Sequence, residues 1–201
     1  MTSSSDIDHA IQKLQLRLDE QNNNPDPDYL DIITHRNEVL NRFQPIFQPA
    51  HISMLTEEEF NSFLPYNNNH HWALQRAGTP ITRDMQLLRK ALIILLDESA
   101  HISVRVNRLR MNYQNAKNSM VPNLGIPYIT GILLIAQPDK YGVWNKTTME
   151  GMEKVGLWEE KWLNDTAGKT YLRLLNIFNQ LTTALNIDHW ALDALWWVIK
   201  K

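Results

Sequence analysis

The sequence predicts an all-α, multi-helix globular fold. Apolar residues recur at intervals of three and four along most of the chain, which is the spacing of one helix face. No segment alternates apolar and polar residues between hairpin turns, as half-buried strands do. Hydrophobic residues make up 43% and charged residues 21% of the 201 residues, as in ordinary folded proteins. We expect roughly eight to ten helices from this periodicity.

The first two helices are expected in the N-terminal quarter of the chain. Apolar residues at helical spacing predict one helix over about residues 7–18, which ends in the polar run 21–28, the best linker candidate. A second helix is expected over about residues 29–43. We therefore divide the chain into an N-terminal helical segment, residues 1–50, which can pack on the main body, and a main helical domain, residues 51–201.

Side chains typical of helix starts place the middle helices. Thr56 followed by Glu59 forms a capping box ahead of an apolar run. Thr82 is expected to cap a long helix that closes near Asp97, and a further helix is expected over about residues 102–109.

Proline and aspartate place the last helices. Pro127 sits where a first helical turn tolerates proline, and Pro138 ends the apolar run that follows. Apolar residues at helical spacing predict a helix over about residues 171–181. Asp188 is a good cap for a final helix.

The composition also bears on the compartment and on membrane association. The chain has no cysteine, so it contains neither a disulfide framework nor a zinc ribbon. Its N-terminus lacks a basic region followed by an apolar core, as a secretory signal would have. The longest apolar stretches are too short to span a bilayer. We expect a cytoplasmic protein that does not associate with membranes.

Charge is distributed unevenly, although the net charge is only −2. Residues 1–64 carry four basic and eleven acidic side chains, whereas residues 76–117 carry eight basic and three acidic ones. A basic middle region can form a local positive face for phosphates. We expect the following side chains from it to contact DNA: Arg105, Arg108, Arg110 and Lys117. The alternative is that these charges only solvate helix surfaces.

A turn containing glycine and proline precedes the most apolar helix of the chain, within VPNLGIPYITGILLIA at residues 121–136. Gly125 is expected to allow the tight turn. Free backbone N–H groups at the start of a helix can hold a DNA phosphate without reading sequence. We expect five residues to form this contact: Asn123, Leu124, Gly125, Ile126 and Pro127. The alternative is a plain turn between two core helices.

Residues 121–157 resemble the signature of the helix-hairpin-helix DNA glycosylase superfamily. That signature runs L-P-G-I-G-P-K-T-A, an apolar helix, then V-D-T-H-V and a helix ending R-L-G. Without a gap, Gly125 matches the second glycine, Trp144 and Asn145 match V-D, and residues 154–156 match R-L-G. The resemblance implies a DNA glycosylase-like fold that binds double-stranded DNA, flips a nucleotide and cleaves its N-glycosidic bond without a cofactor.

Three departures from the signature shape the expected chemistry. Asn123 replaces the first glycine, and asparagine can still adopt a left-handed backbone. Pro127 stands where bifunctional members carry a lysine, so a Schiff-base lyase at that position is excluded and a monofunctional enzyme is expected. Asn145 replaces the catalytic aspartate; an amide cannot accept a proton from water, but it can orient the water.

Lys146 is a candidate alternative nucleophile, and Asp139, Asp188 and Asp193 are candidates to replace the missing carboxylate. Asp188 is more simply a helix cap, and Asp139 is expected in a turn after proline. Lys146 could act as a nucleophile only if it were buried. Asp193 lies among tryptophans in the last helix, where loss of solvent could raise the pKa of its carboxyl group. The alternative for Asp193 is an acid that pairs with a neighbouring helix.

The base pocket is expected at two aromatic positions. In the run His70-His71-Trp72, the tryptophan could stack on a base and a histidine could contact a phosphate or the flipped base. Alternatively, Trp72 anchors helix packing and the histidines lie at the surface. Trp144 is expected beside the pocket because its neighbour, Asn145, would face it. Adjacent histidines cannot both face one metal from a helix, and no HExxH motif is present, so no metal site is expected.

The leading hypothesis is therefore a monofunctional DNA glycosylase-like protein acting on a damaged or modified base. Such a protein would serve in repair or in defence against modified foreign DNA. A non-catalytic reader of such DNA and a helical protein-interaction module are the alternatives.

Overall fold

A computed structural model of the chain describes residues 4–72, 81–114 and 119–201. Within these residues the protein is helical and has no strand; one isolated bridge joins Arg110 and Ser119. The predicted all-α, multi-helix fold is confirmed. The α-helices are α1 (Ser4–Asn23), α2 (Pro27–Phe43), α3 (Pro49–Ile52), α4 (Glu57–Phe63), α5 (Tyr66–Asn69), α6 (Met85–Leu96), α7 (Ile102–Leu109), α8 (Ile126–Ala136), α9 (Lys146–Lys154), α10 (Ala167–Leu185) and α11 (His189–Ile199).

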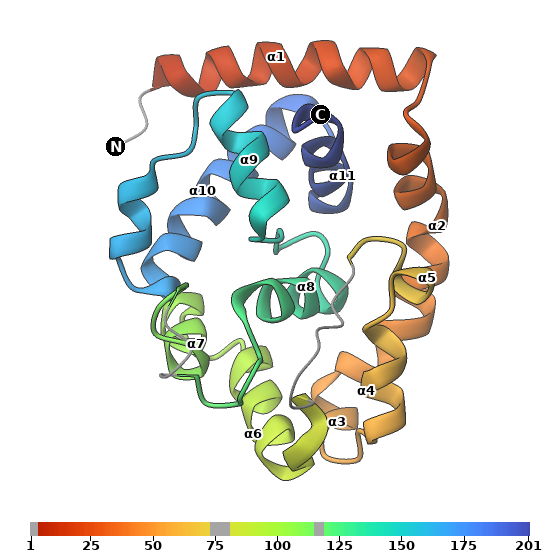
Figure 1. Cartoon of the computed structure of the whole chain (residues 1–201), viewed down its shortest axis with the longest axis vertical. Helices are drawn as coiled ribbons and strands as arrows, with labels where there is room; N and C mark the ends of the chain where they lie inside the picture. The colour runs from red at the N-terminus through yellow and green to blue at the C-terminus, as the bar shows by residue number, and fades with distance from the viewer. Residues whose placement is uncertain (1–3, 73–80, 115–118) are drawn as a thin grey trace.

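The other helices surround α8, which lies at the centre of the molecule (Figure 1). Apolar residues occupy nearly every position of α8, and all but one of its side chains are buried. A helix that is apolar on all sides is stable in water only when protein covers every face. The arrangement of the other helices follows from that requirement.

The N-terminal helices share this core. α1 lies across one end of the molecule and packs on α10 and α11, while α2 runs down one side and packs on α11 (Figure 1). The predicted linker is shorter than expected because α1 continues to Asn23. Gln21 is buried near that end, and its side-chain carbonyl accepts the Asp26 N–H at 2.7 Å, which fixes the corner between the two helices.

The capping prediction at α4 is confirmed, whereas the one at α6 is wrong. The Thr56 hydroxyl accepts the Glu59 N–H at 3.1 Å, and the Glu59 carboxylate accepts the Thr56 N–H at 2.8 Å. Thr82 instead lies in a 3-10 turn and donates its hydroxyl to Glu57. Asp84 caps α6.

The ends of the later helices agree with the sequence signals. Pro127 lies in the first turn of α8, and the helix stops two residues before Pro138. α7 has the expected bounds. α10 is longer than the predicted helix at both ends, and Thr166 caps its first turn. Asp188 caps α11 by accepting the Ala191 N–H at 2.8 Å, as predicted.

Helices α7 and α10 approach each other most closely at Gly168. A Cβ atom added to Gly168 would meet the backbone of Ser103 at a distance that real Cβ atoms do not reach. The Gly168 N–H also donates to the side-chain carbonyl of Asn107 at 2.7 Å. A side chain at residue 168 would therefore force the two helices apart.

We predict that Gly168→Ala lowers the free energy of unfolding by about 1–3 kcal/mol, the usual cost of overpacking a tight contact. Urea unfolding followed by circular dichroism measures the change. Gly125→Ala is the matched control, because an added Cβ there meets only the Pro127 ring, at 3.6 Å, and the backbone φ is −79°. Equal stability of the two variants would contradict the packing at Gly168.

Candidate functional site

The turn before α8 depends on Asn123 and not on Gly125. Asn123 has a φ of 66°, so the expectation that asparagine adopts the left-handed backbone at this position is confirmed. Gly125 has a φ of −79° and a ψ of 169°, an extended conformation open to any residue. The prediction that Gly125 supplies the conformational freedom of the turn is therefore wrong.

The turn offers a phosphate few backbone donors. The N–H groups of Leu124 and Gly125 both bond to carbonyl groups within the turn. Pro127 has no N–H group. Three of the five residues predicted to grip phosphate therefore offer it no free backbone N–H group. The side chains of Leu124 and Ile126 are buried in the core.

The connection into this turn departs from a simple helix-hairpin-helix. In that motif a helix leads straight into the hairpin, whereas α7 ends at Leu109 and α8 begins at Ile126. The described parts of this connection, 110–114 and 119–125, contain no helix. The helix-hairpin-helix assignment stays a prediction.

Arg105 is a core residue, so its predicted contact with DNA is wrong. Only 2% of its surface is exposed. Its guanidinium donates to the Leu95 carbonyl and the Glu98 carboxylate, both at 2.7 Å, and to the Tyr141 hydroxyl. A buried arginine is stable only when its donors are satisfied, and these partners satisfy several of them.

Arg110 closes the loop after α7 and is likewise unavailable to DNA. It is 7% exposed and donates to two backbone carbonyls of the loop and to the Ser119 hydroxyl. The predicted contact of Arg110 with DNA is therefore wrong. Arg108 is exposed, as a phosphate contact requires. Lys117 lies outside the described residues.

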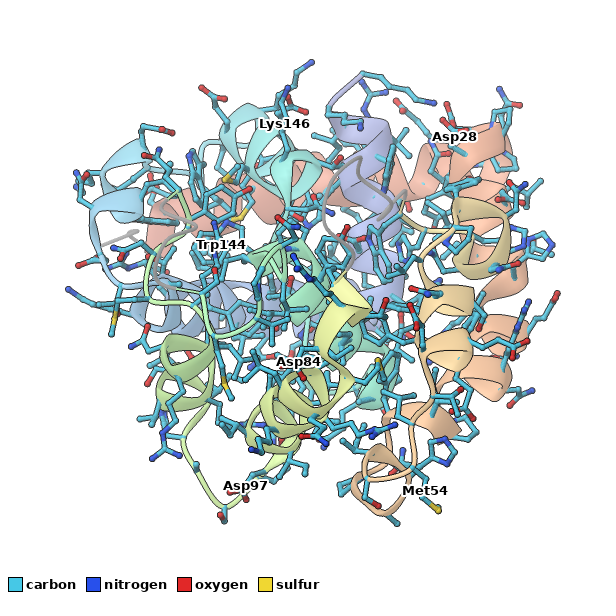
Figure 2. The ribbon with its side chains drawn as sticks, turned by 60° about the horizontal axis from the view of Figure 1, so that its bottom comes forward. Asp28, Met54, Asp84, Asp97, Trp144 and Lys146 are labelled. Carbon is cyan, nitrogen blue, oxygen red and sulfur yellow. The ribbon has the colours of Figure 1, made fainter. Side chains whose placement is uncertain are left out.

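Lys146 and Trp144 do not have the surroundings predicted for them. Lys146 lies at the edge of the molecule, with its side chain 83% exposed and paired with Glu150 (Figure 2). A solvated ammonium is a poor nucleophile, so the proposed covalent role is wrong. Trp144 is completely buried and stacks on Tyr113 with ring centroids 4.8 Å apart. It belongs to the core and does not line an open pocket.

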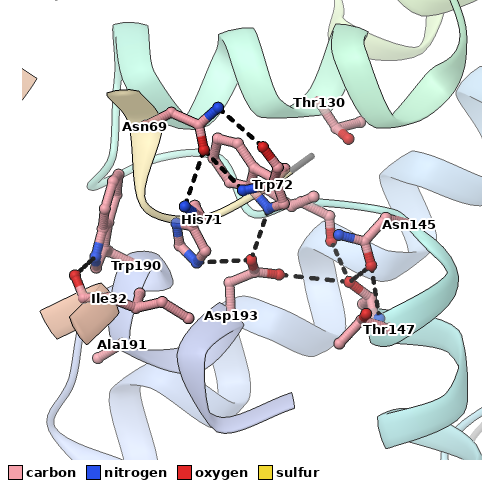
Figure 3. Close-up of polar contacts among 12 residues, drawn as sticks. Ile32, Asn69, His71, Trp72, Thr130, Asn145, Thr147, Trp190, Ala191 and Asp193 are labelled. Carbon is pink, nitrogen blue, oxygen red and sulfur yellow. Dashed lines mark hydrogen bonds and ion pairs between the residues drawn. The ribbon is translucent and has the colours of Figure 1, made fainter. Parts of the chain in front are cut away.

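Four polar side chains from distant parts of the sequence meet at the carboxylate of Asp193 or next to it. Asp193 lies on α11 and is 2% exposed. Its carboxylate accepts the indole N–H of Trp72 at 3.1 Å and lies 2.9 Å from Nε2 of His71 (Figure 3). The hydroxyl of Thr148, in the first turn of α9, is 3.5 Å away on the other carboxylate oxygen. We call Asp193, His71, Trp72, Thr148 and Asn145 the Asp193 cluster.

Asn145 joins this cluster as the cap of α9. Its side-chain carbonyl accepts the Thr148 N–H at 2.9 Å and the Thr148 hydroxyl at 3.2 Å (Figure 3). The Thr148 hydroxyl has a single hydrogen, and its nearest acceptor is the Val143 carbonyl at 3.0 Å. Thr148 therefore lies between Asn145 and Asp193 without hydrogen-bonding both of them at once. The structure thus brings together Asn145 and Asp193, which the sequence suggested separately.

His70 and His71 point in different directions. His70 has a left-handed backbone, with a φ of 52°, and its partly exposed ring pairs with Asp31 on α2. The prediction that His70 lines the base pocket is wrong. His71 is completely buried and stacks on Trp72, with ring centroids 4.3 Å apart. The next residue is Trp72, whose indole N–H donates to the Asp193 carboxylate.

Asn69 fixes the backbone of His71 and Trp72 and was not among the site residues predicted from the sequence. Its side-chain carbonyl accepts the N–H groups of His71 and Trp72 at 2.9 and 2.7 Å, and its amide donates back to the Trp72 carbonyl (Figure 3). Thr148 was missed as well. The signals were present: asparagine favours such side-chain turns, and Asn145 followed three residues later by threonine fits a helix cap.

His71 keeps unused hydrogen-bonding capacity. Its contact with Asp193 meets the distance of an ion pair but not the alignment of a hydrogen bond, and neither ring nitrogen has an aligned partner among the described residues. Buried polar groups are nearly always hydrogen-bonded, so such an exception calls for an explanation. The ring can donate or accept one further hydrogen bond beside the Asp193 carboxylate.

The Asp193 cluster is closed to solvent in this conformation. His71 and Asp193 are 0% and 2% exposed. A surface hollow of about 540 Å³ forms where the ends of α9 and α11 meet, but neither residue lines it. A ligand would therefore reach Asp193 only after a covering side chain moves.

No protein-family model matches the sequence, and no curated protein or solved structure matches the chain. Among the described helices, none combines the length and apolar character needed to cross a membrane.

We predict that Asn145→Ala lowers the free energy of unfolding by about 1 kcal/mol, because the Thr148 N–H loses its cap. Asn145→Ser should lower the free energy of unfolding by much less, since the serine hydroxyl can also accept the Thr148 N–H as a helix cap. Urea unfolding of the two variants and the wild type makes the comparison. A loss as large in the serine variant as in the alanine variant would show that capping is not the role of Asn145.

Proposed function

We propose that this chain binds duplex DNA and acts as a monofunctional N-glycosylase-like enzyme on a damaged or modified base. One observation carries the proposal: the Asp193 carboxylate lies beside His71 and, through Thr148, beside Asn145. The resemblance implies a catalytic aspartate where Asn145 stands. Asp193 supplies a carboxylate next to that position from a different helix.

The chemistry of these groups suits hydrolysis of an N-glycosidic bond. An ionised carboxylate can accept a proton from an attacking water and stabilise the positive charge that develops on the sugar. In our proposal Asp193 takes these roles. The Asn145 amide, held by its cap interaction, and the free hydrogen-bonding capacity of His71 position the water and the base.

The energetics of burial support a chemical role for the Asp193 cluster. Removing a carboxylate from water costs several kcal/mol, even after pairing recovers part of that cost. Apolar side chains of similar volume would often give equal or greater stability. Stability alone therefore does not account for a buried carboxylate at this position.

Trp72 marks the place that a flipped base would take. Its flat ring stacks on His71 with an interplanar angle of 7° and donates an N–H to the Asp193 carboxylate. A purine or pyrimidine could make both contacts, because bases stack on aromatic rings and carry N–H donors. We propose that an entering base displaces Trp72, which opens the closed cluster.

The non-catalytic reader remains the second candidate, and one observation favours it. The Asn145 carbonyl is already committed to Thr148 as a helix cap. The helix cap alone accounts for an asparagine at this position, without a role in orienting a water molecule. A reader would retain the DNA contacts and the base site without cleavage.

We predict that the wild type releases a base from at least one member of a panel of modified duplexes, detected as abasic-site formation. Asp193→Asn should lower that rate by about 100-fold or more, the usual contribution of a general base. Asp139→Asn, an exposed aspartate outside the cluster, is the matched control and should retain the rate.

Binding measured at two salt concentrations separates the alternatives. Contact with phosphates predicts an affinity that falls as salt rises. Salt-dependent binding without any abasic product identifies the reader. Absence of salt-dependent binding overturns both DNA-based functions and leaves the protein-interaction module.

A further inference from the structure

A second group of polar side chains lies where α2 meets the turn after α5. It consists of Asp31 and His35, one turn apart on α2, and His70, which follows α5. Nδ1 of His35 is 3.0 Å from one oxygen of the Asp31 carboxylate, and Nδ1 of His70 is 3.1 Å from the other. Nδ1 of His35 also lies 2.9 Å from the backbone carbonyl oxygen of Asp31. The two imidazole rings stack 3.8 Å apart and are parallel within 6°.

The donor set is one that transition metals prefer. Two imidazole nitrogens and a carboxylate oxygen lie within 4.8 Å of one another, on side chains that are neither fully buried nor fully exposed. Zn²⁺ binds nitrogen and carboxylate oxygen at about 2.0–2.2 Å, so three such ligands around one ion stand a little over 3 Å apart. The two nitrogen–oxygen distances, one to each oxygen of the Asp31 carboxylate, are close to that size.

The surroundings hold the carboxylate as a metal site requires. The Tyr66 hydroxyl donates to the same Asp31 oxygen that faces His70, at 3.1 Å. Ligand carboxylates in metal sites are themselves hydrogen-bonded in this manner.

We propose that Asp31, His35 and His70 bind one divalent transition-metal ion of the Zn²⁺ type, with water completing its coordination. On binding, Nδ1 of each ring is deprotonated, His35 gives up its contact with the Asp31 backbone carbonyl, and the two rings tilt out of parallel so that both lone pairs face the ion. Two nitrogens with one carboxylate suit Zn²⁺, Co²⁺ and Fe²⁺ and do not suit Mg²⁺ or Ca²⁺, which take oxygen ligands.

The bound metal would link α2 to the segment that carries His71 and Trp72 of the Asp193 cluster. Two of its ligands are on α2, and the third, His70, is the residue before His71. α2 is also tied to α11, because the Trp190 indole donates to the Ile32 carbonyl at 2.9 Å. Because the ion would bind the folded protein and not the unfolded chain, it would stabilise the fold. This inference is independent of the proposed glycosylase activity.

Calorimetric titration of the chelator-treated full chain with Zn²⁺ tests the site, with Co²⁺ absorption as a second readout. We expect one Zn²⁺ per chain, a rise in melting temperature with Zn²⁺, and visible bands with Co²⁺. His35→Gln should weaken Zn²⁺ binding by at least about tenfold, because a ligand is lost. His70→Asn should do the same, and asparagine tolerates the left-handed backbone at this position.

His51→Gln is the matched control. His51 also pairs with a carboxylate, that of Glu59 at 3.0 Å, and is about as exposed as His35, but it belongs to no group of three possible ligands among the described residues. It should bind Zn²⁺ like the wild type. Circular dichroism in chelator verifies that each variant is folded, and His35→Gln carries the test if His70→Asn does not fold. No binding by the wild type, or equal binding by the folded His35→Gln variant, would overturn the proposal.

Discussion

The contact between Asp193 and the rings of His71 and Trp72 is the constraint on which the rest of the structure depends. It joins residues 121 positions apart in the sequence and is buried in the interior of the protein. A carboxylate is tolerated in such an interior only with partners at hydrogen-bonding distance, so the elements that carry those partners must come together. The turn after α5, the first turn of α9 and the middle of α11 therefore meet at one point beside α8. Trp72, fixed by this contact, packs over Gly131 of α8.

The local features of the fold could be predicted because their signals are local. The Thr56–Glu59 box and the Asp188 cap each depend on residues three apart, and the bounds of α7 follow from apolar spacing. Thr82 was misassigned because Asp84, two residues later, offers a stronger cap, and a distant Glu57 takes the threonine hydroxyl. The burial of Arg105 and Arg110 could not be predicted from apolar spacing, because their partners lie at the end of α6, near Tyr141 and in the irregular segment after α7.

The candidate site shows the same division between local and distant information. The sequence singled out His71, Trp72, Asn145 and Asp193, but it gave them separate roles and did not indicate that they meet. It also treated His70 and His71 as one unit, whereas the left-handed backbone at His70 turns them to opposite sides. The expected absence of a metal site depended on this adjacent pair and on the lack of an HExxH motif, and neither concerns histidines that are distant in the sequence. Asp31 and His35 approach His70 through the packing of α2 against α5, which periodicity alone does not predict.

The energetic coupling between His71 and Asp193 tests the central claim most directly. A double-mutant cycle compares the free energies of unfolding of His71→Asn, Asp193→Asn, the double variant and the wild type in urea. Side chains in one buried polar network couple by about 0.5–3 kcal/mol. The structure predicts a coupling of at least about 1 kcal/mol, because each single variant leaves a buried group without its partner. Effects that simply add would contradict the placement of this pair at the centre of the fold.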